Sequence, residues 1–186
     1  MEDKVINKVA KSGIININLE TFYPQGVRVL FDIKALLYKD LILKEKDFRE
    51  FVKNEDWSAY QDKYVALICS EDAIVPTWAY MLLATHLTPF AKKVVFGDLE
   101  TLETVLYHEL LNKLPINTYK DARVVIKGCG DLPVPVAAFV EITRLLRPVA
   151  KSIMYGEACS MVPLYKQPRQ PKQLAKKSDQ EHVQKK

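Results

Sequence analysis

Residues 122–156, ARVVIKGCGDLPVPVAAFVEITRLLRPVAKSIMYG, decide the fold that the sequence predicts. The run ARVVIKG is apolar and β-branched, as is typical of a strand that is buried on both faces. After a loop, apolar residues recur at helical spacing in PVPVAAFVEITRLL and stop before Pro148, and AKSIMYG reads as a second strand. The order of strand, helix and strand indicates a right-handed βαβ unit with parallel strands.

The same alternation begins upstream of this stretch. YVALIC (64–69) predicts a strand, VPTWAYMLLATHL (75–87) a helix, KVVFG (93–97) a strand and DLETLETVLYHELLNKL (98–114) another helix. Strands that alternate with helices of this length favour an α/β fold in which a mainly parallel sheet has helices on both faces. We therefore expect a three-layer α/β architecture, and we find no repeat of solenoid type.

The first sixty residues are less regular. GIININL (13–19), VRVLFDI (27–33) and KDLILK (39–44) predict short strands, and EKDFREFVKN (45–54) predicts a helix. We expect this part to extend the same sheet as an irregular, antiparallel N-terminal extension.

Composition is that of an ordinary globular domain. The chain has 186 residues, of which 48% are hydrophobic and 27% charged. The N-terminal stretch MEDKVINKVAKSG lacks the apolar segment of a signal peptide, and no later run reaches membrane-spanning length. These features predict one domain over residues 1–165, a cytoplasmic location and no membrane partner.

The positive charge is concentrated at the C-terminus. The net charge is +4, but residues 166–186 contain seven basic and two acidic residues, so residues 1–165 have a net charge of −1. A nearly neutral body argues against a nucleic-acid partner, because phosphate contacts need clustered Lys and Arg on the folded part. Segment 166–186 is rich in Pro, Gln and Lys, which predicts a disordered basic tail.

The three cysteines share one kind of position. Cys69, Cys129 and Cys159 each follow an apolar, strand-like run and precede a proline. An odd number at wide spacing does not indicate a disulfide framework, so free thiols or metal ligands are expected. If the four parallel strands lie in the order 2-1-3-4, their carboxyl ends, about 4.8 Å apart, bring the cysteines together at one edge of the sheet. Three thiolates suit zinc or an iron-sulfur cluster.

Other residues in the strand-to-helix turns extend this site. Asp98 and Asp131 are candidate fourth ligands, although either carboxylate could instead cap the helix that follows it. Gly128 and Gly130 flank Cys129 and are candidate ligand-binding positions, because their backbone N–H groups can face an anion. His86 and His108 lie near helix ends that run back from this edge, so we expect both at the surface or in packing.

Three alternatives to a shared metal site stay open. Cys129 could be the nucleophile of a thiol-dependent enzyme, but no histidine is placed to act as its base. The glycines and helix N-termini could form a small-ligand-binding module without catalysis, although GCGDLP matches no phosphate-binding fingerprint. The cysteines could also be small buried apolar residues.

Several stretches carry a resemblance to a known family: LILKEKDFREFVKN, DWSAYQDKYVALICS, IVPTWAYMLLATHL, KKVVFGDLETLETVL and KGCGDLPVPVAAFVEITRLLRPVAKSIMYGEACSMVPLYK. Up to about Lys166, the chain resembles an uncharacterised bacterial domain-of-unknown-function family, number 2480. Members of that family look like neighbours of iron-sulfur cluster assembly genes. The resemblance therefore implies iron-sulfur rather than zinc, with iron-sulfur assembly proteins as partners, and it implies no particular reaction.

Overall fold

The computed structural model describes residues 13–128, 130–157 and 160–168. The strands are β1 (Ile14–Asn18), β2 (Arg28–Asp32), β3 (Tyr64–Ile68), β4 (Lys93–Phe96), β5 (Arg123–Lys127), β6 (Ser152–Glu157) and β7 (Ser160–Lys166). The α-helices are α1 (Glu45–Asn54), α2 (Thr77–Leu87), α3 (Leu99–Leu111) and α4 (Val136–Leu146). Short 3-10 helices span Leu19–Phe22, Ile33–Leu36, Trp57–Tyr60 and Ile116–Tyr119. None of the described helices is long and apolar enough to cross a membrane.

The strands form two sheets. The central sheet has the order β2-β3-β4 and is parallel throughout. The terminal sheet has the order β1-β5-β6-β7, in which only β7 is antiparallel to its neighbour. The α/β class with mainly parallel strands is confirmed, whereas the expected order of four parallel strands in one sheet is wrong, because β3 and β4 belong to one sheet and β5 and β6 to the other.

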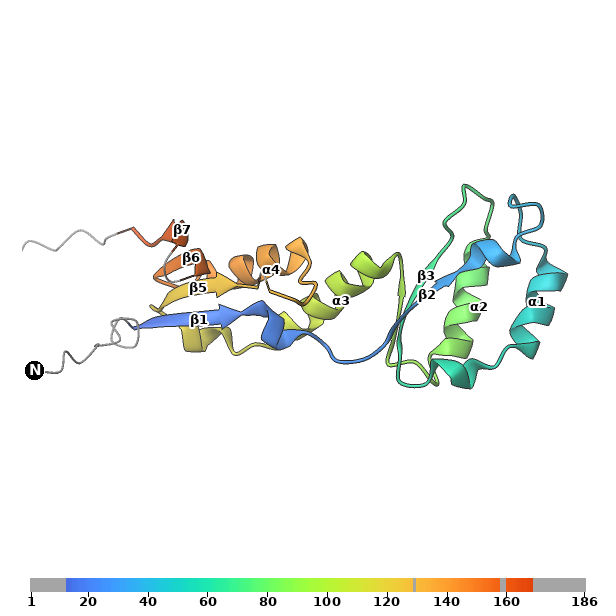
Figure 1. The fold of residues 1–186 in the computed structure, drawn as a ribbon, viewed down its shortest axis with the longest axis horizontal. Helices are drawn as coiled ribbons and strands as arrows, with labels where there is room; N and C mark the ends of the chain where they lie inside the picture. The colour runs from blue at the N-terminus through green and yellow to red at the C-terminus, as the bar shows by residue number, and fades with distance from the viewer. Residues whose placement is uncertain (1–12, 129, 158–159, 169–186) are drawn as a thin grey trace, which may run out of the picture.

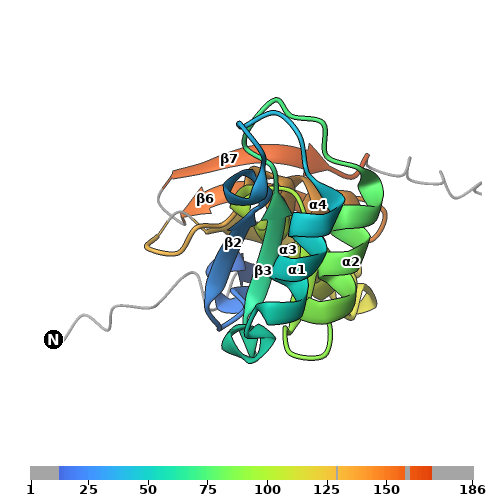
Figure 2. The same cartoon turned by 90° about the vertical axis from the view of Figure 1, so that its right-hand side faces the viewer.

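Helix α3 separates the sheets because it is apolar on two sides. Leu102 and Leu106 are buried against Ala66 of the central sheet, while Tyr107 and Leu111 are buried in the core of the terminal sheet. A helix with two buried sides needs a packed layer on each. The central sheet thus lies between α1 and α2 on one face and α3 on the other, which confirms the three-layer arrangement (Figure 1). Figure 2 views the molecule from the α1 end, with α1 and α2 side by side.

The N-terminal strands differ from expectation. Strand β1 pairs with β5, and β2 with β3, in parallel and not antiparallel. Strand β2 reaches β3 through the crossover helix α1, and such a connection produces parallel strands. KDLILK is not a strand, because Lys39 and Asp40 have positive φ values of 52° and 55° in a turn closed by a bridge between Tyr38 and Ile42. Instead, β7 is the antiparallel strand, and it continues through Lys166 into the segment predicted as tail; residues 169–186 lie outside the described residues.

The two sheets contain equivalent units of sequence, 59 positions apart, which align without insertion or deletion. Tyr64 of β3 pairs with Lys93 of β4, and the residues 59 positions later, Arg123 and Ser152, pair in the same way. Asp62 and Asp121, again 59 apart, have φ values of 59° and 57°, and their N–H groups donate to equivalent carbonyls of Phe90 and Val149 at 3.0 and 2.9 Å. The chain therefore contains two copies of one strand-helix-strand unit, each with an added parallel edge strand, β2 in the central sheet and β1 in the terminal sheet.

The hydrophobic cores follow the same correspondence. Equivalent buried residues are Phe48 and Tyr107, Val52 and Leu111, Val65 and Val124, Leu67 and Ile126, Ala79 and Ala138, Leu83 and Ile142, and Leu87 and Leu146. In the central sheet these residues lie on the face covered by α1 and α2 or on those helices, and in the terminal sheet they lie on the face covered by α3 and α4 or on those helices. The duplication therefore extends to packing, and a feature of one sheet can be compared with its counterpart in the other.

Candidate functional site

The carboxyl ends of β1, β5 and β6 surround a cavity of about 240 Å³. Its lining comprises Asn18, Glu20, Lys127, Gly128, Gly130, Tyr155, Gly156 and Glu157. Strands β5 and β6 are adjacent and parallel, so the loops that follow them both begin at this edge. Ligands of open α/β folds bind outside the carboxyl ends of parallel strands, and this cavity is therefore the candidate site.

Two glycines at this edge stand where a side chain would not fit. Gly156 has a φ of 114°, a conformation that side-chain-bearing residues rarely adopt. A Cβ atom at Gly128 would lie 3.1 Å from the Cβ of Leu19 and 3.2 Å from the ring of Phe139. A side chain at either position would therefore be strained or would press on its neighbours, so both positions favour glycine.

Charged side chains surround the cavity. The Oε1 atom of Glu20 accepts a hydrogen bond from the N–H of Gly130 at 2.5 Å. The side chain of Asn18 accepts from the N–H of Glu20 at 3.2 Å and so caps the short helix that carries this carboxylate. Lys127 Nζ lies 3.3 Å from Glu157 Oε1. Two carboxylates against one ammonium group leave the cavity with a negative balance, which favours a cation.

The predicted glycines are found at this cavity, and Gly128 and Gly130 both line it. Cys129, which stands between them in the sequence, and Cys159, two positions after Glu157, lie outside the described residues. Asp131 follows Gly130 in an exposed loop and does not cap α4, because the residue at the start of that helix is Pro135, which makes no side-chain capping bond.

Cys69 lies elsewhere, at the carboxyl end of β3 in the central sheet. It is half-buried beside the core between this sheet and helices α1 and α2, and its Sγ donates to the carbonyl of Glu71 at 3.4 Å. Its counterpart in the terminal sheet, 59 positions later, is Gly128. The structure therefore does not place Cys69 at the sheet edge from which the loops containing Cys129 and Cys159 begin, because β3 and β5 are in different sheets.

Asp98 is a helix cap. Its Oδ1 accepts from the N–H of Thr101 at 2.8 Å and from the hydroxyl of Thr101 at 2.7 Å, and these hydrogen bonds lower the pKa of Asp98 below its ordinary value. It follows β4 of the central sheet, away from the cavity. Across residues 13–128, 130–157 and 160–168, no group of three or more His, Cys, Asp or Glu side chains could hold a metal ion.

The histidines are in packing and at the surface, as expected. The ring of His86 lies 5.3 Å from that of Trp57, measured between centroids. His108 Nδ1 lies 3.4 Å from Glu141 Oε1 on the exposed side of α3. Neither histidine lines the cavity.

Sequence reasoning missed Asn18, at the end of β1, and Glu20, in the short helix that follows β1. The sequence signal that could have found them is their equivalence to Asp32 and Lys34. In each case the first residue ends an edge strand and caps the short helix that contains the second. Burial raises the pKa of Asp32, but hydrogen bonds from Ser70 and Lys34 outweigh it and lower that pKa below the ordinary value. In both sheets, therefore, a side chain at or just after the end of the edge strand accepts a hydrogen bond from the loop that follows the middle strand.

The sequence places the chain in a family. The family described as "Protein of unknown function (DUF2480)" matches residues 3–167, and the chain belongs to it. No curated protein matches the chain, and no solved structure matches it.

Proposed function

We propose that this member of the DUF2480 family binds a metal ion or an iron-sulfur cluster through Cys129 and Cys159, at the carboxyl edge of β5 and β6. The observation that carries the proposal is that Gly128 and Gly130, the sequence neighbours of Cys129, line the same cavity as Glu157, which precedes Cys159 by two residues. Loops that start from adjacent parallel strands at one cavity are short enough to present both thiols to it.

The chemistry of the cavity fits such a ligand. Thiolates are the preferred ligands of zinc and of iron-sulfur clusters, and carboxylates such as Glu20 and Glu157 can complete a zinc site. The negative balance of the lining favours a cation. Lys127 lines the same cavity, and a nearby ammonium group favours the thiolate, which is the form of cysteine that binds metal. A reducing compartment, the cytoplasm, is part of the proposal because it keeps these thiols free.

The proposed ligand set leaves out two residues of the sequence prediction. Cys69 lies at the edge of the other sheet, and Asp98 is engaged as the cap of α3. Asp131 stays in the set as a carboxylate in the loop after β5. Iron-sulfur assembly proteins are the proposed partners, on the strength of the family resemblance.

The test is metal and acid-labile sulfide content, with a visible absorption spectrum, of protein purified without oxygen. Cys129→Ser and Cys159→Ser should each lose the bound metal and its absorption, and Cys69→Ser is the matched control that should retain both. Iron with sulfide identifies a cluster, and zinc without sulfide identifies a mononuclear site. Metal that persists in Cys129→Ser, or that disappears in Cys69→Ser, contradicts the proposal, as does protein that takes up no metal on reconstitution.

The alternative of a thiol enzyme is less well supported by the same cavity. An anion formed on a substrate of Cys129 needs free backbone N–H donors, and that of Gly130 already donates to Glu20. His86 and His108 lie outside the cavity, so neither can act as base there. A small-ligand module without catalysis is the outcome that metal-free but folded protein would favour.

A further inference from the structure

A second pocket lies between the first turn of α3 and the loop that leads into α4. Its volume is about 390 Å³, and none of its lining residues belongs to the cavity at the carboxyl ends of β1, β5 and β6. Its apolar walls comprise Leu99, Pro133, Val134 and Pro135. Pockets that bind small molecules measure about 300 to 1,000 Å³ and combine apolar walls with a few polar groups. This α3 pocket therefore has the size and the lining of a small-molecule site.

The internal repeat shows how the α3 pocket differs from the equivalent place in the other unit. The residues 59 positions before Glu100 and Pro133 are Leu41 and Ile74. In the unit that forms the central sheet, the N–H of Ile74 donates to the carbonyl of Leu41 at 2.9 Å and ties the two loops together. Proline has no N–H group, so Pro133 cannot form the equivalent hydrogen bond. Glu100 and Pro133 line the pocket instead.

The charged groups give the α3 pocket a negative balance, with Glu100 and Glu103 against Arg28. Arg28 and Glu103 neutralise each other in a nearly buried ion pair. Glu100 forms no ion pair with any residue in the part of the chain that the structure describes. Burial, with the charge of Glu103 as a second cause, raises the pKa of Tyr23, which also lines the pocket, above its ordinary value. An unneutralised carboxylate beside apolar walls favours a ligand with a positive charge.

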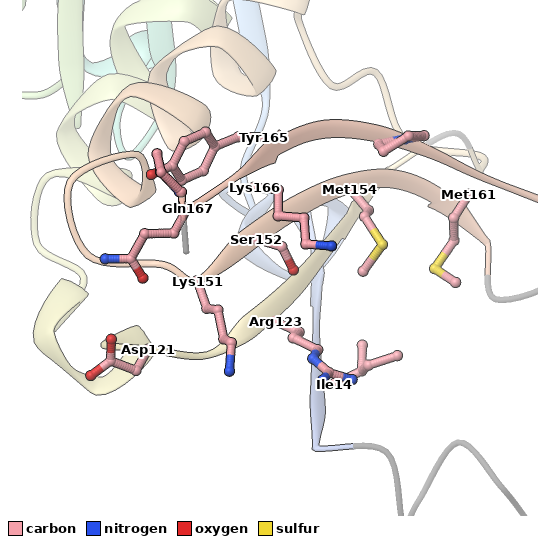
Figure 3. A pocket seen from close by; sticks show the side chains of 12 residues that line it. Ile14, Asp121, Arg123, Lys151, Ser152, Met154, Met161, Tyr165, Lys166 and Gln167 are labelled. Atoms are coloured by element: carbon pink, nitrogen blue, oxygen red, sulfur yellow. The ribbon is translucent and has the colours of Figure 1, made fainter. Parts of the chain in front are cut away.

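A larger groove, of about 1040 Å³, has the opposite charge. It lies on the face of the terminal sheet opposite to the one that α3 and α4 cover. Arg123, Lys151 and Lys166 line it against Asp121 (Figure 3). A cationic ligand is therefore repelled by this groove and favoured by the α3 pocket. The groove serves as the reference site in the experiment below.

We propose that the α3 pocket binds a small organic amine, in which a primary ammonium group is carried on an apolar body such as an aromatic ring. The ammonium group pairs with Glu100, and the apolar body lies against Leu99 and Val134. Both oxygens of Glu103 already accept hydrogen bonds from Arg28, which leaves Glu100 as the carboxylate available to a ligand. This site does not depend on the proposed metal site.

Titration of the full chain with three probes of one shape tests the proposal. The probes are phenethylamine, phenethyl alcohol and phenylpropionate, which carry a positive charge, no charge and a negative charge on the same apolar body. In amide NMR spectra, phenethylamine should shift the signals of Leu99 and Val134 and leave those of Met154 and Met161, in the reference groove, unchanged. The amine should bind about fivefold more tightly than the alcohol, which corresponds to an exposed ion pair of about 1 kcal/mol. Phenylpropionate should bind more weakly than the alcohol.

Two variants separate the charge of Glu100 from the apolar contacts. In Glu100→Gln, the amine and the alcohol should bind equally well, and the affinity for the alcohol should match that of the wild type. Glu45→Gln removes the same charge from the first turn of α1, away from the pocket, and should retain the fivefold preference.

Three results would overturn the proposal. The first is the absence of shifts at Leu99 and Val134 with phenethylamine. The second is a preference for the amine that persists in Glu100→Gln or disappears in Glu45→Gln. The third is phenylpropionate that binds at Leu99 and Val134 as tightly as the amine, because the pocket would then select an apolar body without regard to charge.

Discussion

Glu103 of α3 holds Arg28 of β2 in a two-pronged ion pair, with Nε to Oε1 at 2.6 Å and Nη2 to Oε2 at 3.2 Å. The two side chains are only 12% and 11% exposed. The guanidinium group also lies over the rings of Tyr23 and Tyr64, 4.3 and 5.1 Å from their centroids. This ion pair links α3 to the central sheet, and α3 lies between the two sheets.

Removing one partner of this ion pair should lower the free energy of unfolding. Glu103→Gln keeps the shape of the side chain but leaves the Arg28 charge nearly buried without a counter-ion, and the expected loss is about 2 to 4 kcal/mol of unfolding free energy. Urea unfolding followed by circular dichroism measures it. The control is Glu109→Gln on the same helix, whose partner Lys93 is a third exposed, with an expected loss under about 1 kcal/mol. Equal losses in the two variants would contradict the fastening role of Glu103.

The βαβ units were predictable because helical and strand periods are local, but these local periods do not show the division into two sheets. It depends on α3, whose Leu102 and Leu106 face one sheet and Tyr107 and Leu111 the other. The sequence of a helix with two apolar sides can equally be that of a helix with one wide apolar side packed on a single sheet. The gapless 59-residue correspondence, with identical residues at Asp62 and Asp121, Pro76 and Pro135, and Gly97 and Gly156, was the signal that would have shown two units.

Gly156 should not tolerate a side chain. Its φ of 114° is strained for any other residue, and a Cβ atom there would run into the backbone carbonyl of Ser160. Gly156→Ala should therefore lower the unfolding free energy by about 2 to 3 kcal/mol. Gly13→Ala is the control: its φ is 63° and a Cβ would meet nothing within 4 Å, so the expected loss is about 1 kcal/mol. Thermal unfolding distinguishes the two, and a larger effect at Gly13 would count against this account of the cavity edge.

One part of the candidate site follows from local sequence patterns, and the other part depends on contacts between distant segments. Gly128 and Gly130 come after a recognisable strand, so their place at a sheet edge follows from the βαβ pattern. Glu20 reaches the same cavity from the short helix after β1, 110 positions away from Gly130 in the chain. No local pattern reports such a contact, because it depends on which strand pairs with β5.

Glu20 should hold the loop after β5 in place. Glu20→Ala removes the acceptor of the Gly130 N–H, and a hydrogen bond to a charged group contributes about 1.5 to 3 kcal/mol. We expect amide exchange at Gly130 to accelerate about tenfold or more, which corresponds to about 1.4 kcal/mol. Lys34→Ala, at the equivalent position of the central sheet, should leave that exchange rate unchanged. An unchanged rate in Glu20→Ala would remove the carboxylate from the architecture of the site.

Tyr107 should make the fold sensitive to alkaline pH. Burial, with the nearby charge of Glu103 as a second cause, raises the pKa of Tyr107 to about 12 from 10.0. Its hydroxyl donates to the carbonyl of Leu19 at 3.3 Å, so the neutral form is the one that the fold holds. An unfolded chain ionises this tyrosine near pH 10 while the folded chain does not. The stabilisation is therefore complete below pH 10 and is lost as the pH rises toward 12, by about 3 kcal/mol at most.

Tyr107→Phe isolates this effect, because phenylalanine keeps the buried ring and cannot ionise. Urea midpoints measured between pH 8 and 11.5 should fall less steeply in the variant than in the wild type. The difference between the two curves should open only above about pH 10, the ordinary pKa of tyrosine. Parallel curves over the whole range would assign the alkaline loss to other tyrosines and leave Tyr107 as a packing residue between α3 and β1.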